Sequence, residues 1–259
     1  MKNLKFVKSI VQLNFILVSV QAWNLQPSLQ DSANPFYRVK ATTSGVISTN
    51  GKAIYTSVDG NVWKKLPVSC NGDTSFHISS AANHRGEMAA VGSRIGVVDG
   101  RLDYIGMVFT GSSTFNCTDH DRRAVLLSEL SDITAIPAYL PHFLMVGKKG
   151  TILSCVDPWL TVPCTTEVNS DFYSVAANDK EAVAVGWKGA VAYSRYPFSR
   201  WKSLAIDTSV SFFGVKYIDN CFMAVGLKGT VLKIFSDSTW TVSSIGTSIM
   251  LADIAKGQM

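Results

Sequence analysis

Apolar and polar positions alternate along most of the chain in short runs. Runs such as 182–185 and 222–225 contain four to six residues and are rich in Val, Ala, Ile and Phe. Gly, Asn, Asp and Pro separate one run from the next. Runs this short do not form stable helices, whereas alternation with a period of two is typical of antiparallel strands. The pattern predicts an all-β chain.

One motif recurs along the chain. An apolar run, Val-Gly, a short polar turn and a second Gly follow one another at residues 87–96, 142–150, 181–189 and 221–229. The Val-Gly glycines Gly147, Gly186 and Gly226 are 39 and 40 residues apart, whereas Gly92 and Gly147 are 55 apart. These intervals indicate a repeat of about 40 residues, with an insertion at roughly 99–124 in the second unit.

Each repeat contains four short runs, and four of the five repeats carry a tryptophan after the third run, so one repeat predicts one four-stranded antiparallel sheet. Such sheets must stack, because an isolated sheet leaves both faces wet and both edges unpaired. The length of about 40 residues matches a propeller blade. We expect a β-propeller of five blades. Six is the alternative, because residues 251–255 resemble the first strand of a further repeat. The expected repeats are 36–74, 75–131, 132–171, 172–210 and 211–250.

The turn at residues 56–63 carries a recognisable signature. It reads Thr-Ser-Val-Asp-Gly-Asn-Val-Trp and resembles the Asp-box of BNR-type propellers, with one residue fewer between Asp and Gly. Degenerate copies stand at 154–159 and 235–240. We interpret these residues as hairpin staples, because Asp and Ser side chains hydrogen-bond turn backbone and Trp covers the hairpin. The residues concerned are Ser57, Asp59, Gly60, Trp63, Asp157, Trp159, Asp237 and Trp240.

Together with the Ala-Val-Gly strands, these boxes are similar to the photosystem II stability/assembly-factor-like branch of that superfamily. The resemblance implies a propeller that binds protein and helps a membrane complex to assemble. Sialidases share the Asp-box, and Arg38 resembles their first arginine motif, but Lys40 stands where they have proline. The other arginines do not recur at equivalent positions, and no catalytic motif is found, which favours binding over catalysis. The four histidines show no metal-ligand spacing, so neither a metal nor another cofactor is predicted.

The N-terminus has the pattern of a signal peptide. Lys2, Lys5 and Lys8 precede an apolar run at 15–20, and Val-Gln-Ala ending at Ala22 suits a signal peptidase. We predict a signal peptide at 1–22 and a single propeller domain at 23–259, exported to the periplasm or the extracellular space. An N-terminal membrane anchor is the alternative. Beyond residue 22, no apolar run is long enough to span a bilayer as a helix.

Composition narrows the class of protein. The 259 residues are 47% hydrophobic and 17% charged, which excludes disorder as the main state. Removing the three leader lysines lowers the formal charge from +5 to +2, which gives no reason to expect a nucleic-acid partner. Five cysteines in an exported chain suggest disulfides. We predict a Cys155–Cys164 bridge across a hairpin, with Cys70–Cys117 as second choice; all five reduced is the alternative.

If the strands alternate in direction, the Val-Gly turns share one face. Basic residues there predict a broken ring for an acidic protein, a polysaccharide or lipid head groups, with ordinary solubility as the alternative: Arg94, Lys148, Lys149, Lys188 and Lys228. The opposite rim is a weaker candidate for a ligand site: Asn83, His84, His142, Asn178, Asp179, Asp219 and Asn220. The insertion is a candidate partner epitope through His120, Arg122 and Arg123, with a flexible insert as the alternative.

The function we expect is that of an exported, non-enzymatic scaffold, which binds protein as an assembly or stability factor for an envelope or secreted complex. One alternative is a glycan-binding propeller or a sialidase-like glycoside hydrolase. Another is a structural subunit of a cell-envelope machine such as a secretion apparatus.

Overall fold

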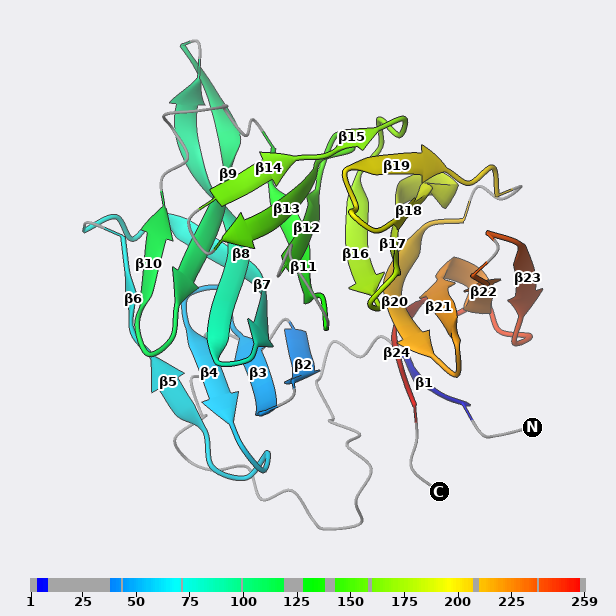
Figure 1. Cartoon of the computed structure of the whole chain (residues 1–259), viewed down its shortest axis with the longest axis horizontal. Coiled ribbons are helices and arrows are strands. Elements are labelled where there is room, and N and C mark those ends of the chain that lie inside the picture. The colour runs from blue at the N-terminus through cyan, green and yellow to red at the C-terminus, as the bar shows by residue number, and fades with distance from the viewer. Residues whose placement is uncertain are drawn as a thin grey trace.

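The computed structural model describes residues 4–8, 38–42, 44–70, 72–98, 100–118, 128–137, 143–157, 160–206, 210–236 and 238–256. These residues form a β-propeller, which confirms the predicted fold class. Five sheets of four or five strands succeed one another around a common centre (Figure 1). A two-stranded sheet follows the fifth.

Each blade is an antiparallel meander whose first strand is innermost, as the contacts between successive first strands show. Blade one is β2 (Arg38–Thr42), β3 (Gly45–Thr49), β4 (Ile54–Ser57) and β5 (Lys64–Leu66). Blade two is β7 (Phe76–His84), β8 (Glu87–Val98), β9 (Arg101–Gly111) and β10 (Phe115–Thr118). Blade three is β11 (Leu130–Ala135), β12 (Phe143–Gly147), β13 (Ile152–Asp157) and β14 (Leu160–Pro163).

Blade four is β16 (Phe172–Ala177), β17 (Glu181–Gly186), β18 (Val191–Arg195) and β19 (Arg200–Ser203). Blade five is β20 (Phe212–Ile218), β21 (Cys221–Gly226), β22 (Thr230–Ile234) and β23 (Trp240–Ser244). Two short strands tie neighbouring blades together, because β6 (Val68–Ser69) and β15 (Thr165–Thr166) add in parallel to β10 and β19 of the following blade. Single 3-10 turns, η3 (Trp187–Gly189) and η4 (Leu227–Gly229), follow β17 and β21.

The repeated Val-Gly dipeptide has a packing cause. In blades two to five the first strand carries a bulge at one point, and the Val-Gly glycine lies beside it. A Cβ on Gly147, Gly186 or Gly226 would meet a backbone oxygen of the chain entering its own blade, closer than real Cβ atoms approach. Only glycine lets the two backbones come this near, so the motif repeats with the blade.

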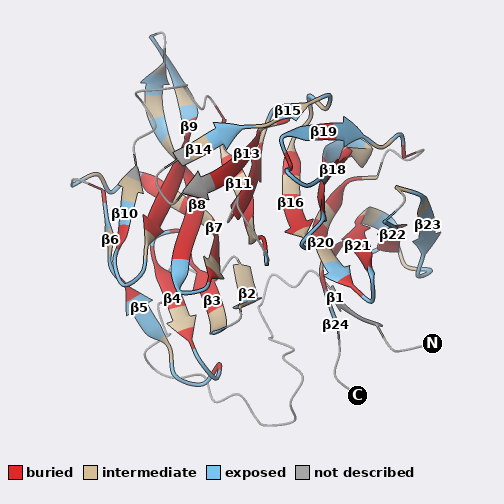
Figure 2. Cartoon of the chain, viewed as in Figure 1, coloured by how far each residue is buried: buried red, intermediate tan, exposed pale blue. Residues whose placement is uncertain are grey.

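Apolar clusters fill the space between neighbouring blades. One cluster joins blades two and three through Val91, Leu130 and Met145, and the next joins blades three and four through Leu144 and Phe172. Figure 2 shows the buried residues concentrated on the inner strands. Second strands such as β17 and β21 are buried along their whole length, because each face packs on another blade.

The predicted Cys155–Cys164 disulfide is wrong. The structure joins Cys70 to Cys117, whose Cα atoms are 5.1 Å apart, and neither Cys155 nor Cys164 takes part in a disulfide. In the β13–β14 hairpin, Cys155 lies opposite Thr161, three positions from Cys164. An odd offset places two residues on opposite faces of a sheet. Accordingly, Cys155 packs in the cluster towards blade two and Cys164 in the cluster towards blade four.

The sixth position holds β24 (Leu251–Lys256), paired antiparallel with β1 (Leu4–Lys8). β1 lies inside the predicted signal peptide, whereas the predicted cleavage site at Ala22 lies outside the described residues. Within the described residues, no helix is long and apolar enough to cross a membrane.

Candidate functional site

A two-stranded arm projects from blade two (Figure 1). β7 stops pairing with β8 at Arg94, yet β8 and β9 continue to pair as far as Val98 and Arg101. Two residues are left for the turn, and Gly100 has φ 75°. We call residues 95–104 the hairpin arm; among the described strands, they pair only with one another. Much of the predicted 99–124 insertion therefore extends the blade rather than forming a loop.

One face of the hairpin arm is apolar and exposed. Ile95 lies opposite Tyr104 and Val97 opposite Leu102, and paired residues share a face of the sheet. These four side chains are 55%, 47%, 68% and 76% exposed, respectively. The arm is drawn largely in pale blue and tan in Figure 2. A lone two-stranded ribbon is marginal in water, and an exposed apolar face marks an interaction surface.

Lysines of blade three brace the base of the arm. Lys148 Nζ lies 2.7 Å from Glu129 Oε2 and 5.3 Å from the centre of the Tyr104 ring. The hydrogen bond to Glu129 raises the pKa of the Lys148 ammonium. Lys149 Nζ lies 3.9 Å from Asp103 Oδ2. The contacts with Tyr104 and Asp103 connect the base of the arm to blade three, whereas Ile95, Val97 and Leu102 stay exposed.

The predicted basic residues form a row rather than a ring. Lys149, Lys188 and Lys228 occupy the same place in the turns of blades three, four and five, each with a left-handed φ of 49° to 55°. Lys188 Nζ lies 5.8 Å from the ring centre of its neighbour Trp187. Arg94 does not join them, because it stands within β8 opposite Phe76 and Ile105 rather than in a turn.

Other predicted residues take part in turns or lie outside the described residues. His120, Arg122, Arg123 and His142 lie outside them. On the opposite rim, Asn178 Oδ1 accepts the backbone N–H of Lys180 and of Glu181 at 2.8 Å. Asp219 Oδ1 accepts from Lys256 Nζ at 2.6 Å. Within the described part of the chain, no three His, Cys, Asp or Glu side chains gather as a metal site.

The turn with the Asp-box-like sequence is held by its own hydrogen bonds. Asp59 Oδ1 accepts the N–H groups of Asn61 at 2.8 Å and Val62 at 3.1 Å, and these bonds lower the pKa of the Asp59 carboxyl. Gly60 N donates to Ser57 Oγ at 2.8 Å, and Trp63 Nε1 donates to Gly60 O at 3.0 Å.

The later copies are less complete. Trp159 and Asp237 lie outside the described residues, and of Asp157 only the backbone is described. Trp240 begins β23 opposite Ile234. Trp201 Nε1 donates to Phe198 O at 3.0 Å, so blade four repeats the tryptophan contact seen in blade one without an Asp-box sequence.

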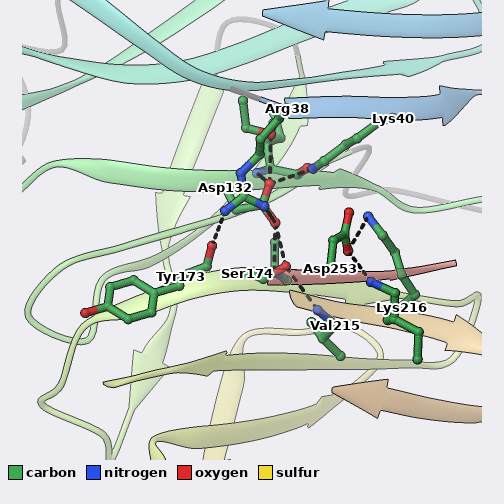
Figure 3. Close-up of polar contacts among 12 residues, drawn as sticks. Arg38, Lys40, Asp132, Tyr173, Ser174, Val215, Lys216 and Asp253 are labelled. Carbon is green, nitrogen blue, oxygen red and sulfur yellow. Dashed lines mark hydrogen bonds and ion pairs between the residues drawn. The ribbon is translucent and has the colours of Figure 1, made fainter. Parts of the chain in front are cut away.

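The centre of the propeller contains a polar cluster that sequence reasoning missed (Figure 3). Asp132 on β11 is 1% exposed. Its carboxylate accepts from Lys40 Nζ at 2.6 Å, Ser80 Oγ at 2.7 Å and Ser174 Oγ at 2.9 Å. Arg38 Nη1 lies 3.3 Å from Oδ2. One carboxylate therefore binds side chains of blades one, two and four from its place on blade three.

Charge compensation explains why this carboxylate tolerates burial. Burial alone would raise the pKa of Asp132, but Arg38, Lys40 and Lys216 outweigh it and hold that pKa well below its usual range. Burial lowers the pKa of Lys40 to about 8, against the attraction of Asp132. Arg38 also donates to Tyr173 O at 2.7 Å. Arg38, which resembles the first arginine motif of sialidases, thus binds residues of the propeller centre.

The sequence matches no protein-family model and no curated protein. Solved structures share the fold. One described as YCF48 bound to D1 peptide is 11% identical over 82% of this chain and 67% of that chain, with a TM-score of 0.57. The Neurospora crassa Pan2 WD40 domain is 8% identical over 85% and 68%, with a TM-score of 0.54. The RRP9 WD40 repeats are 9% identical over 86% of each chain, with a TM-score of 0.53. These likenesses establish the propeller fold.

Proposed function

We propose that this chain is an exported, non-enzymatic scaffold that binds a partner protein through the apolar face of its hairpin arm. The observation that carries the proposal is the outward set of Ile95, Val97, Leu102 and Tyr104 on a braced ribbon. Apolar side chains at the centre of a surface and charged groups around it are the usual composition of a protein interface.

The lysine row defines the chemistry of the partner. Lys148, Lys149, Lys188 and Lys228 lie at the turns of blades three to five, beginning beside the arm. A partner with an apolar strip and a carboxylate-rich border would complement both features. The fold supports a scaffold role, because a structure similar in fold is described as bound to a peptide, D1.

The resemblance in sequence and the signal-peptide pattern support a proposed location outside the cytoplasm. We place the mature chain, residues 23–259, in the periplasm or outside the cell, where it acts as an assembly or stability factor for an envelope or secreted complex. An oxidising compartment is consistent with the Cys70–Cys117 disulfide. Arg38 is held by Asp132 and Tyr173, so the structure offers no support for the sialidase-like alternative.

Affinity purification from the native host with a double substitution in the arm tests the proposal. Val97→Ser with Leu102→Ser removes the exposed apolar pair near the tip, and we expect recovery of the partner to fall at least tenfold. The melting temperature should stay unchanged, because both residues are exposed. Val58→Ser is the control, since Val58 is also an exposed apolar residue, 86% exposed, but lies in a turn of blade one. Equal recovery with the arm variant and the control would contradict the proposal.

A further inference from the structure

The sixth position of the propeller is only half built. Leu251 and Ile254 of β24 are buried in one cluster with Ile218, Cys221 and Met223 of blade five. In the described residues, the sheet at this position has two strands, whereas every other blade has at least four. β24 is therefore fixed to the ring on one face, and β1 alone covers its hydrogen-bonding edge.

β24 repeats the first strand of a blade in register as well as in sequence. Its pairing shifts between Leu251 and Asp253, as the pairing of β11 shifts between Leu130 and Asp132. Asp253 Oδ1 accepts the N–H of Ile254 at 2.9 Å, the same contact that Asp132 makes with the residue after it. The two strands are equivalent, so the edge of β24 is the place where a blade seats its second strand.

In blades three, four and five, the second strand is the most buried element of the blade. β12, β17 and β21 are buried at every position. On β24 this seat is taken by Leu4–Lys8, which belong to the predicted signal peptide. Cleavage after Ala22 would remove this strand and leave backbone N–H and C=O groups of β24 unpaired. Such an edge is a template for pairing with another chain.

We propose that the edge of β24 is a strand-accepting site, which in the processed chain binds an extended segment of a partner protein antiparallel to β24. The inference rests on the proposed export, because the seat is vacated by removal of residues 1–22. Main-chain hydrogen bonds would supply the affinity, and alternate side chains of the incoming segment would supply the selectivity.

The register specifies the incoming segment. Residues directly opposite each other share a face, and Ile254 faces the core of blade five, so the position opposite Ile254 requires an apolar residue. Phe6 stands at that position in the resident strand. Charged side chains of β24 contribute little to binding of the incoming segment, because they already have partners. Asp253 Oδ1 lies 3.9 Å from Lys216 Nζ, and Lys256 Nζ lies 2.6 Å from Asp219 Oδ1.

A labelled peptide tests the site without knowledge of the partner. The probe is a fluorescent synthetic peptide of residues 2–9, and the protein is the full chain carrying Phe6→Pro, which weakens the resident strand. We expect the peptide to bind this variant at least tenfold more tightly than the unaltered chain, whose seat is occupied. Hydrogen exchange of residues 251–256 should slow on binding. The control peptide carries Asp at the Phe6 position and should bind at least tenfold more weakly.

Equal binding of the two peptides, binding without slower exchange in β24, or no binding to a folded variant would overturn the proposal. If Phe6→Pro does not fold, the unaltered chain serves instead. Saturating peptide should then speed the exchange of residues 4–8 while β24 stays protected, and unchanged exchange of residues 4–8 would overturn the proposal.

These measurements are independent of the arm. The variant with Val97→Ser and Leu102→Ser should bind the peptide normally, so loss of the arm function leaves the edge intact. Sequencing the N-terminus of the chain from its native host tests export separately. Retention of residues 1–22 would contradict the proposed processing and would confine the edge to its resident strand.

Discussion

Asp132 shows how much one buried residue connects. It accepts hydrogen bonds from Lys40, Ser80 and Ser174, and its carboxylate is the counter-ion of Arg38 and Lys40. Removing one partner of a buried ion pair leaves the others charged and desolvated, which costs more than the pair itself contributes. Asp132 is therefore the residue of the ring centre whose loss should cost most.

We expect Asp132→Asn to lower the free energy of unfolding by about 3 kcal/mol, because Arg38 and Lys40 lose their buried anion. Urea denaturation followed by tryptophan fluorescence measures the change. Asp253→Asn is the matched control, since Asp253 occupies the equivalent place on β24 but its side chain is 47% exposed. The control should change stability by less than about 0.5 kcal/mol. Equal effects of the two substitutions would contradict a special role for Asp132.

The same variant should alter the pH dependence of stability. The pKa of Asp132 is depressed in the folded chain, so its contribution is complete above the unfolded pKa of about 4 and is lost as the pH falls towards the folded value. Between pH 5 and pH 2, the unaltered chain should lose more stability than Asp132→Asn. Parallel curves in acid denaturation would show that another carboxylate dominates.

Gly186 shows why glycine recurs in the Val-Gly motif. Its Cβ would collide with the backbone oxygen of Asp171, so Gly186→Ala should destabilise the fold by about 2 kcal/mol through overpacking. Gly72→Ala offers a comparison, because a Cβ there meets nothing within 4 Å and the cost arises only from φ 85°. Thermal melts should rank Gly186→Ala as the less stable of the two. The reverse order would mean that backbone conformation, not close approach, selects glycine in the motif.

At the scale of elements, the disulfide ties the end of blade one to the outer strand of blade two. Cys70 follows β6 and Cys117 lies in β10, on which β6 pairs in parallel. Closing a loop with a sequence separation of 47 residues should stabilise the fold by about 4 kcal/mol. Reductant should lower the melting temperature, and Cys70→Ser should remove that sensitivity.

Thiol counting provides the control for the disulfide. The denatured, unreduced chain should show three reactive thiols, from Cys155, Cys164 and Cys221. Cys155→Ser should leave the response to reductant unchanged. One reactive thiol instead of three would indicate a second bridge and would contradict the pairing seen here.

At the scale of the whole molecule, the repeat was predictable because it has a local cause. Each Val-Gly glycine is required because two backbone segments of its own blade lie very close together. The motif therefore recurs once in each such blade, and its spacing indicates the fold. The polar cluster at the centre of the propeller was not predictable, since Lys40 and Asp132 lie 92 residues apart in the sequence. No local sequence pattern near either residue indicates that the two side chains are in contact. The predicted Cys155–Cys164 disulfide was wrong because of the register of the β13–β14 hairpin. The sequence predicts the hairpin, but it does not show that Cys155 lies opposite Thr161, three positions from Cys164.

The hairpin arm could have been foreseen from its sequence. Asp99-Gly100 stands between alternating apolar residues, which is a strong signal for a two-residue hairpin. In the repeat, these residues stand out only as extra length between Gly92 and Gly147, although they form a regular pair of strands. The sequence does not show that Ile95, Val97 and Leu102 stay exposed, because their burial depends on neighbouring elements, and blade three contacts only the base of the arm.

The hydrogen bond from Arg38 to Tyr173 has a consequence for folding during synthesis. Arg38 donates to the carbonyl of Tyr173, 135 residues further on, so the first blade cannot complete its inner contacts until the fourth has been synthesised. Contacts between residues so distant in sequence form slowly, since the chain must lose the entropy of closing a long loop before the contact stabilises it. In a nascent chain, blade one therefore lacks this contact until Tyr173 of blade four has been synthesised.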